Sequence, residues 1–327
     1  MDTVRWGLLS TASINRRLIP AIQASRRGQL LAVASRTQAT ADAYAAQWQI
    51  PHAFGSYQAM LESDQIDAVY IGLPNHLHAE WSIRAIQAGK HVLCEKPFAL
   101  TLADVDAMID ASHKNQRVLA EAFMYRHHLQ TKILGEWVGS GRIGEPIVVR
   151  SVFNYLLGNR NNVRLKPEYG GGCLWDIGVY PVSFAQFIFS GPPVAVEGFQ
   201  WIGESGVDET FNGQMLYPRG GVAQISSSFH SPFYIHAEVI GTEGRLTLTR
   251  PFAAMDTDRQ MCFFAVDGES VEIPVPEVEL YSGEVNDMHA AILDHTPSYL
   301  TLEETRNHVR TILALYEAAN KNEVIPL

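Results

Sequence analysis

Lys96 lies in Glu95-Lys96-Pro97, which follows residues 91–94, an apolar run with the length and composition of a buried strand. Open α/β sheets bind ligands at the carboxyl ends of their strands. A primary amine there can hold or pass a proton beside a carbonyl or hydroxyl oxygen. The alternative is a surface lysine in the turn before Pro97, and position alone leaves both interpretations open.

Asp176 and Tyr180, a carboxylate and a phenol four residues apart, follow the three glycines 170–172. On a helix the two side chains share one face. A carboxylate and a phenol on one face can bracket a substrate hydroxyl and serve in proton transfer. The alternative makes Asp176 a helix cap and Tyr180 a core aromatic, and the spacing does not exclude it.

Further polar residues stand near predicted strand ends. Tyr125, Arg126 and His127 begin where the fifth strand ends, and they could line a sugar pocket or form a solvated crossover. Asn154 and Arg164, in and after the first strand of the second half, are weaker substrate-binding candidates of the same kind.

The turn after the first strand is made of small and hydroxyl-bearing residues. A dinucleotide fold needs them here, because the backbone must approach a pyrophosphate whose charge rests on the next helix N-terminus. The G-x-G-x-x-G pattern would place glycines where this chain has Ser10, Ala12 and Asn15. The predicted phosphate-binding residues are Ser10, Thr11, Ala12, Ser13 and Ile14. A strand followed by a serine-capped helix is the alternative.

The second strand ends in Ser35, Arg36 and Thr37, with no acidic residue among them. A free ribose 2′-hydroxyl normally meets Asp or Glu at this place. One cation and two hydroxyls suit a 2′-phosphate instead. In a dinucleotide fold these residues favour NADP(H) over NAD(H), and the alternative is a solvated arginine.

The third strand ends in Leu73, Pro74, Asn75, His76 and, two residues later, His78. Leu73, Pro74, Asn75 and His78 suit contact with the ribose and nicotinamide of a cofactor, although His78 could equally cap or orient the loop. A metal pair of His76 and His78 has no third ligand nearby in sequence, so we predict no metal site.

The elements that must position these residues alternate between strand and helix in the first third. Strands are predicted at 4–9, 30–35, 68–73, 91–94 and 118–122, and helices at 14–25, 40–48, 57–61, 79–88 and 102–115. This alternation predicts a parallel, doubly wound α/β sheet.

The pattern changes after about residue 123. A helix is predicted at 129–140, then strands at 147–156, 194–201, 210–217, 221–228, 235–241 and 244–248, then helices at 285–294 and 302–319. Consecutive strands without helices predict an open, mostly antiparallel sheet. We therefore expect a dinucleotide-binding Rossmann domain at 1–122 and a substrate-binding and oligomerisation α/β domain at 123–327.

Composition excludes several classes of protein. The 327 residues carry a net charge of −10 with no Lys/Arg run, which disfavours nucleic acid as a partner. Apolar stretches fall short of the ~20 residues of a membrane span, and a strand at the N-terminus leaves no room for a signal peptide. Three scattered cysteines, Cys94, Cys173 and Cys262, fit reduced thiols in a cytoplasmic protein.

Taken in order, these segments resemble the Gfo/Idh/MocA oxidoreductase family. The specific parts are Glu95-Lys96-Pro97, the Pro74-Asn75-x-x-His78 motif before it, and Gly-Gly-Gly-x-Leu-x-Asp-x-Gly-x-Tyr at 170–180. Many members have histidine at the last position of that motif, and tyrosine here resembles the branch with aldose 1-dehydrogenases and dihydrodiol dehydrogenases. Residues 121–126 resemble the NADP-dependent D-xylose dehydrogenase branch. The glycine-poor loop 10–15 departs from the family pattern.

The resemblance implies a bound nicotinamide cofactor that exchanges hydride with a sugar or related polyol. Lys96 would be the catalytic lysine, with Glu95 beside it at the cofactor and Asp176 and Tyr180 on the substrate side. Relatives often pair into dimers through the second-domain sheet, so a homo-oligomer (dimer or tetramer) is expected. An aldose 1-dehydrogenase is the leading expectation. A trans-dihydrodiol dehydrogenase, a 1,5-anhydrofructose or keto-sugar reductase, and a non-catalytic dinucleotide-binding redox sensor are the alternatives.

Overall fold

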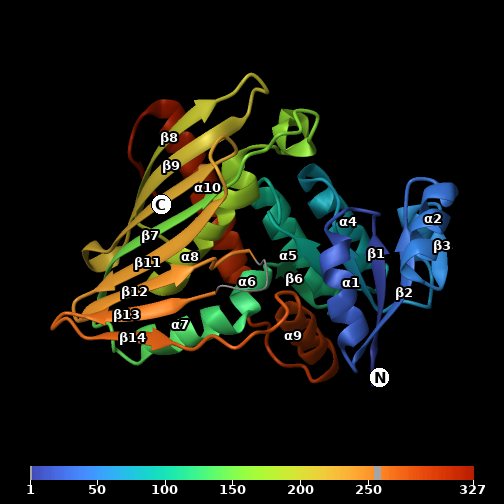
Figure 1. Cartoon of the computed structure of the whole chain (residues 1–327). Helices are drawn as coiled ribbons and strands as arrows, with labels where there is room; N and C mark the ends of the chain where they lie inside the picture. Colours follow the sequence, from blue (N-terminus) through green and yellow to red (C-terminus); the bar gives the residue numbers. More distant parts are fainter. Residues whose placement is uncertain (1, 254–258) are drawn as a thin grey trace. The chain divides into compact units, whose positions relative to one another are not determined.

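The computed structural model describes residues 2–253 and 259–327 of the chain, which Figure 1 shows coloured from the N-terminus to the C-terminus. They form two compact units, Met1–His127 with Tyr281–Thr305, and His128–Leu280 with Arg306–Leu327. The segment 281–305 thus packs with the first unit, although it lies far along the sequence. The assignment of dinucleotide binding to 1–122 and of substrate binding to 123–327 stays a prediction.

The first unit contains a six-stranded parallel sheet in the order β3-β2-β1-β4-β5-β6. Its strands are β1 (Val4–Leu9), β2 (Gly28–Ala34), β3 (His52–Phe54), β4 (Ala68–Ile71), β5 (His91–Glu95) and β6 (Leu119–Ala122). Every residue of β4 is buried, as expected for a parallel strand covered on both faces. The predicted doubly wound Rossmann sheet is confirmed. The edge strand β3 was not predicted, because three half-buried residues give no periodic signal.

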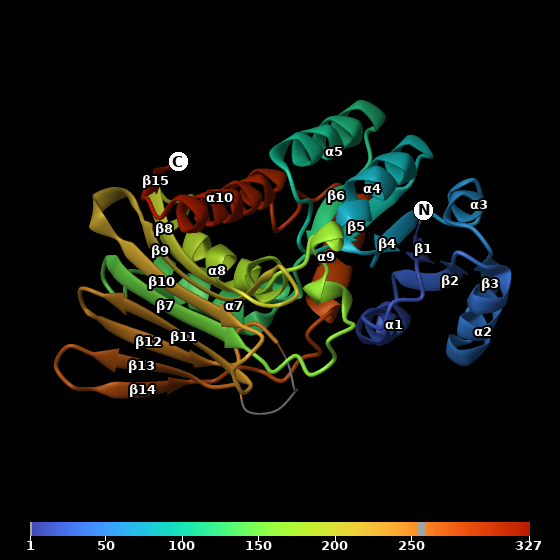
Figure 2. The same cartoon turned by 90° about the horizontal axis from the view of Figure 1, so that it is seen from above.

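Helices cover both faces of this sheet. They are α1 (Asn15–Ala24), α2 (Gln38–Trp48), α3 (Tyr57–Leu61), α4 (His78–Gln87), α5 (Leu102–Asn115), α6 (Met124–His127) and α9 (Ser282–Leu293). Figure 2 shows α4 and α5 on one side of the sheet and α1 and α9 on the other. Side-chain caps fix three of these helix starts: Thr37 accepts a hydrogen bond from the Thr40 amide in α2, Ser56 accepts one from the Ala59 amide in α3, and Thr101 accepts one from the Asp104 amide in α5.

The second unit contains a nine-stranded sheet in the order β14-β13-β12-β11-β7-β10-β9-β8-β15. Its strands are β7 (Pro146–Asn154), β8 (Ala195–Ile202), β9 (Asp208–Leu216), β10 (Val222–Ser228), β11 (Tyr234–Gly241), β12 (Gly244–Thr249), β13 (Met261–Ala265), β14 (Ser270–Ile273) and β15 (Ile325–Pro326). β10 and β7 are parallel and the other neighbouring pairs are antiparallel, which confirms the predicted, mostly antiparallel sheet. The short outer strands β13, β14 and β15 were not predicted.

One face of this sheet is covered by helices. The unit holds α7 (Leu129–Gly139), a π-helix (Leu174–Gly178), α8 (Val179–Phe189) and most of α10 (Leu302–Lys321). Leu315 of α10 packs against Gly198 and Gly213 on the adjacent strands β8 and β9. The π-helix has a wider turn than the α-helix that the sequence suggested, and such turns are frequent at functional sites.

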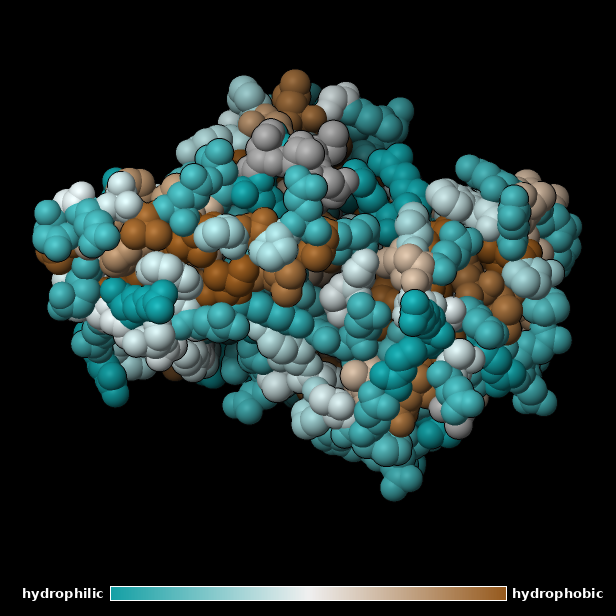
Figure 3. Space-filling model, turned by 60° about the horizontal axis from the view of Figure 1, so that its bottom comes forward, coloured by the Kyte–Doolittle hydropathy of each residue, from teal (hydrophilic) through white to brown (hydrophobic). Residues whose placement is uncertain are grey.

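The other face of the sheet carries no helix of this unit within the described residues, and several large apolar side chains are exposed in its strands. Phe199 and Trp201 in β8, Leu216 in β9 and Tyr234 in β11 are between 45% and 58% exposed. On the molecular face in Figure 3, hydrophobic residues gather in a band on the side of the nine-stranded sheet, bordered by hydrophilic residues. Among the described helices, none has both the length and the apolar character needed to span a membrane.

Candidate active site

Lys96 follows the last residue of β5, at the carboxyl edge of the parallel sheet, as the sequence predicts. Its backbone amide donates to Glu95 Oε2 at 3.2 Å, and the hydroxyl of Tyr70 in β4 donates to Glu95 Oε1. Burial, followed by the charges of Glu95 and Glu284, holds the pKa of Tyr70 well above its usual range. Tyr70 is therefore a protonated donor that fixes the Glu95 carboxylate beside Lys96.

His78 is fully buried and connects two loops at the same edge. Its Nδ1 lies 2.8 Å from the carbonyl oxygen of Pro97, and its Nε2 lies 2.8 Å from that of Leu73. Burial lowers the pKa of His78, an effect that the two carbonyl contacts partly oppose. His78 therefore joins the turn after β4 to the turn after Lys96, which fits its role in orienting the loop.

No group of three or more His, Cys, Asp or Glu side chains in the described chain is arranged to hold a metal ion.

The turn after β1 fits the phosphate end of a dinucleotide. Ser10 has a φ of 139°, a conformation that favours glycine, at the position of the first glycine of the dinucleotide pattern. Its hydroxyl donates to the Gly72 carbonyl at 3.0 Å, and its own carbonyl accepts from Asn15 Nδ2 at 2.8 Å. The Ser10 and Asn15 side chains thus hold the turn in shape, while Ser13 is exposed and α1 begins two residues after it.

The residues after β2 fit the adenosine end. Ser35 is buried, whereas Arg36 and Thr37 are exposed. The Thr37 hydroxyl caps α2, whose first turn contains no acidic residue. A positive side chain beside a helix N-terminus without acidic residues is a favourable environment for a phosphate. Pro74 and Asn75, after β4, are half-buried.

The predicted sugar-pocket residues of α6 are buried in the first unit. Tyr125, Arg126 and His127 are 0%, 2% and 7% exposed. Arg126 donates to Glu304 Oε1 at 2.8 Å, and His127 Nδ1 lies 2.6 Å from Asp287 Oδ2. Arg126 and His127 therefore attach the distant segment 281–305 to the first unit, a role that their sequence position does not reveal.

In the second unit, Asp176 lies in the π-helix and is buried between two donors. The Tyr155 hydroxyl donates to Asp176 Oδ2 at 2.9 Å, and Arg164 Nε donates to the same oxygen at 2.8 Å. The negative charge of Asp176 is the main reason for the raised pKa of Arg164, to which Tyr155 and Tyr180 contribute. Burial, then Asp176, raises the pKa of Tyr155. The structure therefore brings together Asp176, Arg164 and Tyr180, which the sequence singled out, and adds Tyr155.

Tyr180 stands in the first turn of α8 with its ring against aromatic side chains. Its centroid lies 5.4 Å from that of Phe153 and 5.8 Å from that of Phe252. Asn154, the next residue along β7, lies on the opposite face of that strand, and its amide donates to Ser231 Oγ at 3.5 Å. Continuing the alternation of β7 one residue past its end places Tyr155 on the same inner face as Phe153, and this signal could have identified Tyr155 from the sequence.

Asp208 at the start of β9 holds the beginning of the π-helix. Its Oδ2 accepts from the Leu174 amide at 2.8 Å and from Cys173 Sγ at 3.2 Å, and its Oδ1 accepts from the Tyr316 hydroxyl at 2.7 Å. Burial raises the pKa of Asp208 to about 6, although these donors oppose the effect. A side chain at Gly172 would lie against Asp208 Oδ1, so this glycine is required for the close approach. Asp208 was not found from the sequence.

Comparisons with known proteins agree with both units. A model described as an oxidoreductase family with an NAD-binding Rossmann fold matches residues 4–123, and a GFO/IDH/MocA C-terminal domain model matches residues 132–247. A D-xylose 1-dehydrogenase (NADP(+)) of Haloferax volcanii is 36% identical over 324 residues, covering 98% of this chain and 99% of the relative.

Two solved structures share the fold over nearly the whole chain. An aldose-aldose oxidoreductase from Caulobacter crescentus, complexed with glycerol, matches with a TM-score of 0.92 and 26% identity, covering 99% of this chain and 100% of that one. A 3-ketoreductase from Actinomadura kijaniata, in complex with NADP and TDP-benzene, matches with a TM-score of 0.89 and 27% identity, covering 97% and 98%.

Proposed function

The chain belongs to the Gfo/Idh/MocA family of NAD(P)-dependent oxidoreductases, and we propose that it is an NADP(H)-dependent aldose 1-dehydrogenase of the D-xylose type. The observation that carries the proposal is the buried carboxylate of Asp176, which is held by the half-buried Tyr155 and the more exposed Arg164 next to Tyr180. Together these residues present hydroxyl, guanidinium and carboxylate groups, which are the partners that a polyol needs. The full-length likeness to a D-xylose 1-dehydrogenase supports the substrate class.

In the proposed reaction, Lys96 in the first unit and Tyr180 in the second unit are the two candidate proton-transfer groups. The bound nicotinamide supplies the hydride acceptor in the oxidative direction. Tyr180 or Lys96 takes the hydroxyl proton. Where Tyr180 takes it, Lys96 donates a hydrogen bond that stabilises the negative charge on the substrate oxygen. Asp176 positions the substrate through its fixed carboxylate. Glu95, held by Tyr70, sets the direction of the chain at Lys96.

The preference for NADP(H) rests on the residues after β2. Arg36 is exposed and Thr37 caps α2, with no acidic residue present to accept a ribose 2′-hydroxyl. Ser10, Thr11, Ala12, Ser13 and Ile14 would hold the pyrophosphate, and Leu73, Pro74, Asn75 and His78 would border the nicotinamide ribose. Both the Haloferax relative and the Actinomadura structure are named with NADP.

A keto-sugar nucleotide reductase is the second candidate, because the Actinomadura 3-ketoreductase matches over 97% of the chain. A nucleotide-linked sugar brings a diphosphate that requires cations. The charge of Arg164 is already balanced by Asp176 at 2.8 Å, which favours the free aldose. A non-catalytic redox sensor would bind the cofactor and turn over no substrate.

The test is a thermal-shift comparison of NAD(H) with NADP(H), followed by steady-state assays of aldoses, dihydrodiols and keto sugars with the preferred cofactor. We expect stabilisation by NADP(H) and turnover of D-xylose. Binding without turnover of any substrate would favour the sensor, and turnover of a nucleotide sugar alone would favour the second candidate.

We also propose that the protein forms a dimer or tetramer through the open face of the nine-stranded sheet. Phe199 and Leu216 are exposed on this face and could contact a second copy of the chain. Ile225 and Phe229 are buried within their own unit and therefore do not belong to the proposed contact. Light scattering of Phe199→Glu beside the wild type tests this surface, and an unchanged mass contradicts it.

The three free cysteines fit a cytoplasmic location, which we propose on that basis.

A further inference from the structure

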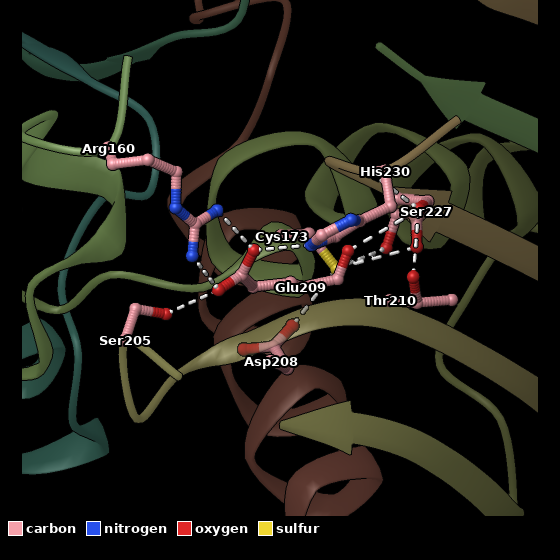
Figure 4. Close-up of polar contacts among 9 residues, drawn as sticks. Arg160, Cys173, Ser205, Asp208, Glu209, Thr210, Ser227 and His230 are labelled. Atoms are coloured by element: carbon pink, nitrogen blue, oxygen red, sulfur yellow. Dashed lines mark hydrogen bonds and ion pairs between the residues drawn. The ribbon is translucent and has the colours of Figure 1, made fainter. Parts of the chain in front are cut away.

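Glu209, the second residue of β9, is a fully buried carboxylate whose partners come from three different loops. Arg160 Nη1 and Nη2 donate to its two oxygens at 2.6 and 2.7 Å. Ser205 Oγ donates to Oε1 at 2.7 Å, and His230 Nε2 lies 2.6 Å from Oε2. Figure 4 shows the carboxylate between Arg160 and His230, with Ser205 on the side of Arg160.

This carboxylate is ionised in the folded protein. The hydrogen bond from Arg160 is the largest of the causes that lower the pKa of Glu209 to about 2. The neighbouring Asp208 has a raised pKa, because the effect of burial outweighs the opposing hydrogen bonds from its amide, phenol and thiol donors. Two parallel contacts between guanidinium and carboxylate fix the relative orientation of the groups as well as their distance.

The first loop attached to Glu209 is 155–163, which follows β7. The amides of Tyr155 and Leu157 still pair with the carbonyls of Ser228 and Phe229. Residues 158–161 are exposed, and Arg160 returns from this exposed tip to Glu209. Four residues later Arg164 reaches Asp176. The loop and the residue that follows it therefore supply two arginines, each paired with a carboxylate of the body of the unit.

The second loop is 229–233, which follows β10. His230 contacts Glu209, and its ring packs edge-on against Trp201 with centroids 4.7 Å apart. The amide of Phe229 donates to the backbone carbonyl of Glu209 at 2.8 Å. A side chain at Gly203 would lie against the Glu209 carboxylate, so the hairpin between β8 and β9 is also shaped around it.

We infer that Arg160, Glu209 and His230 are positioning residues that fix the loops 155–163 and 229–233 to the sheet edge and thereby hold Arg164 at Asp176. This inference rests on the proposed function, in which Arg164 and Asp176 contact the sugar. None of the three acts on the reacting atoms. Their effect is on substrate affinity, because a loose loop populates the binding-competent conformation less often.

Hydrogen exchange on the full chain tests the loop anchoring directly. Arg160→Met should raise amide exchange at 156–163 about tenfold and leave 229–233 protected, whereas Glu209→Gln should raise exchange in both loops. Arg160→Lys should restore part of the protection. The matched control is Arg27→Met, which removes another bidentate pair, at 2.7 and 2.7 Å from Asp294, in the first unit. If a single variant fails to fold, exchange is measured instead on the double variant Arg160→Met/Glu209→Gln, which removes both charges.

Steady-state kinetics tests the consequence. Arg160→Met should raise KM for the aldose about tenfold while kcat changes less than about threefold, as expected for lost binding rather than lost chemistry. Exchange in both loops equal to that of the Arg27→Met control overturns the anchoring, and an unchanged KM despite faster exchange overturns the positioning of Arg164. If the wild type oxidises no aldose, the proposed function fails, while the exchange data still decide the anchoring.

Discussion

In the first unit the candidate residues stand at the carboxyl ends of neighbouring parallel strands, whereas in the second unit they meet through side-chain pairs between residues 12 to 49 positions apart. Strand order alone gathers Ser10, Lys96 and the turn after β4 at one sheet edge. The Asp176 carboxylate is held instead by hydrogen bonds from Tyr155 and Arg164, which lie in the segment after β7. The first arrangement is fixed by backbone topology, and the second by buried charge.

The largest expected effect separates chemistry from binding in the first unit. Lys96→Met should lower kcat about 10⁴-fold, because it removes a proton-transfer and charge-stabilising group. NADPH affinity, measured by fluorescence titration, should stay within a few-fold. The exposed Lys114→Met is the matched control and should retain full activity. Normal turnover by Lys96→Met would refute the role of this lysine.

The buried charge of the second unit should matter almost as much. Asp176→Asn should lower kcat/KM about 10³-fold, equivalent to about 4 kcal/mol, since it leaves Arg164 without its ionic partner. Circular dichroism checks that the unit is folded. Loss of activity should be smaller for Tyr155→Phe, which removes one neutral donor. Equal effects of the two substitutions would show that the charge is unimportant.

Asp208 has a raised pKa and its neighbour Glu209 a lowered one, so Asp208 should make the free energy of unfolding fall as the pH rises. The folded pKa of Asp208 is raised to about 6 from 3.8, so its stabilising contribution is complete below about pH 4 and is lost as the pH rises through 6. The free energy of unfolding of the wild type should therefore fall relative to Asp208→Asn between pH 4 and 6, by about 3 kcal/mol at most. Urea unfolding at several pH values measures this difference. Parallel curves for the two proteins would contradict burial of an ionisable Asp208.

The smallest expected effect concerns the cofactor. Arg36→Asp should shift the ratio of kcat/KM values toward NAD about tenfold, because it replaces an exposed cation by an acid that repels a 2′-phosphate. Arg84→Asp, also on the surface of the first unit, is the control. Unchanged selectivity removes Arg36 from the binding of the cofactor.

The same contrast explains how much of the molecule could be predicted from sequence. Helix α5 and strand β1 begin and end at the predicted residues, because their periodic apolar pattern matches the burial that each element has. The motif at 95–97 correctly placed Lys96 at the end of β5, and the catalytic role of this lysine stays a prediction. Glu209 and Asp208 were missed, since nothing within β9 indicates the partners that Arg160 and Tyr316 supply from far along the chain.

Sequence spacing also has a limit at Asp176. Four residues place Asp176 and Tyr180 on one face of an α-helix, but Asp176 lies in a π-helix, where that periodicity does not hold. Instead, both residues act on Arg164: the charge of Asp176 and, to a smaller extent, Tyr180 raise the pKa of its guanidinium group. Arg126 and His127, predicted at a sugar pocket, pair with Glu304 and Asp287. Their partners lie more than a hundred residues away and could not be inferred from local pattern.

The central claim is that a sugar carbon gives its hydride to the nicotinamide of NADP(+). The most direct measurement uses D-xylose deuterated at C1 with NADP(+) and the wild-type enzyme, followed by mass spectrometry of the reduced cofactor. We expect NADPH that carries the deuterium and a slower reaction than with unlabelled D-xylose. Unlabelled NADPH, or the absence of any reduced cofactor, would contradict the proposed reaction.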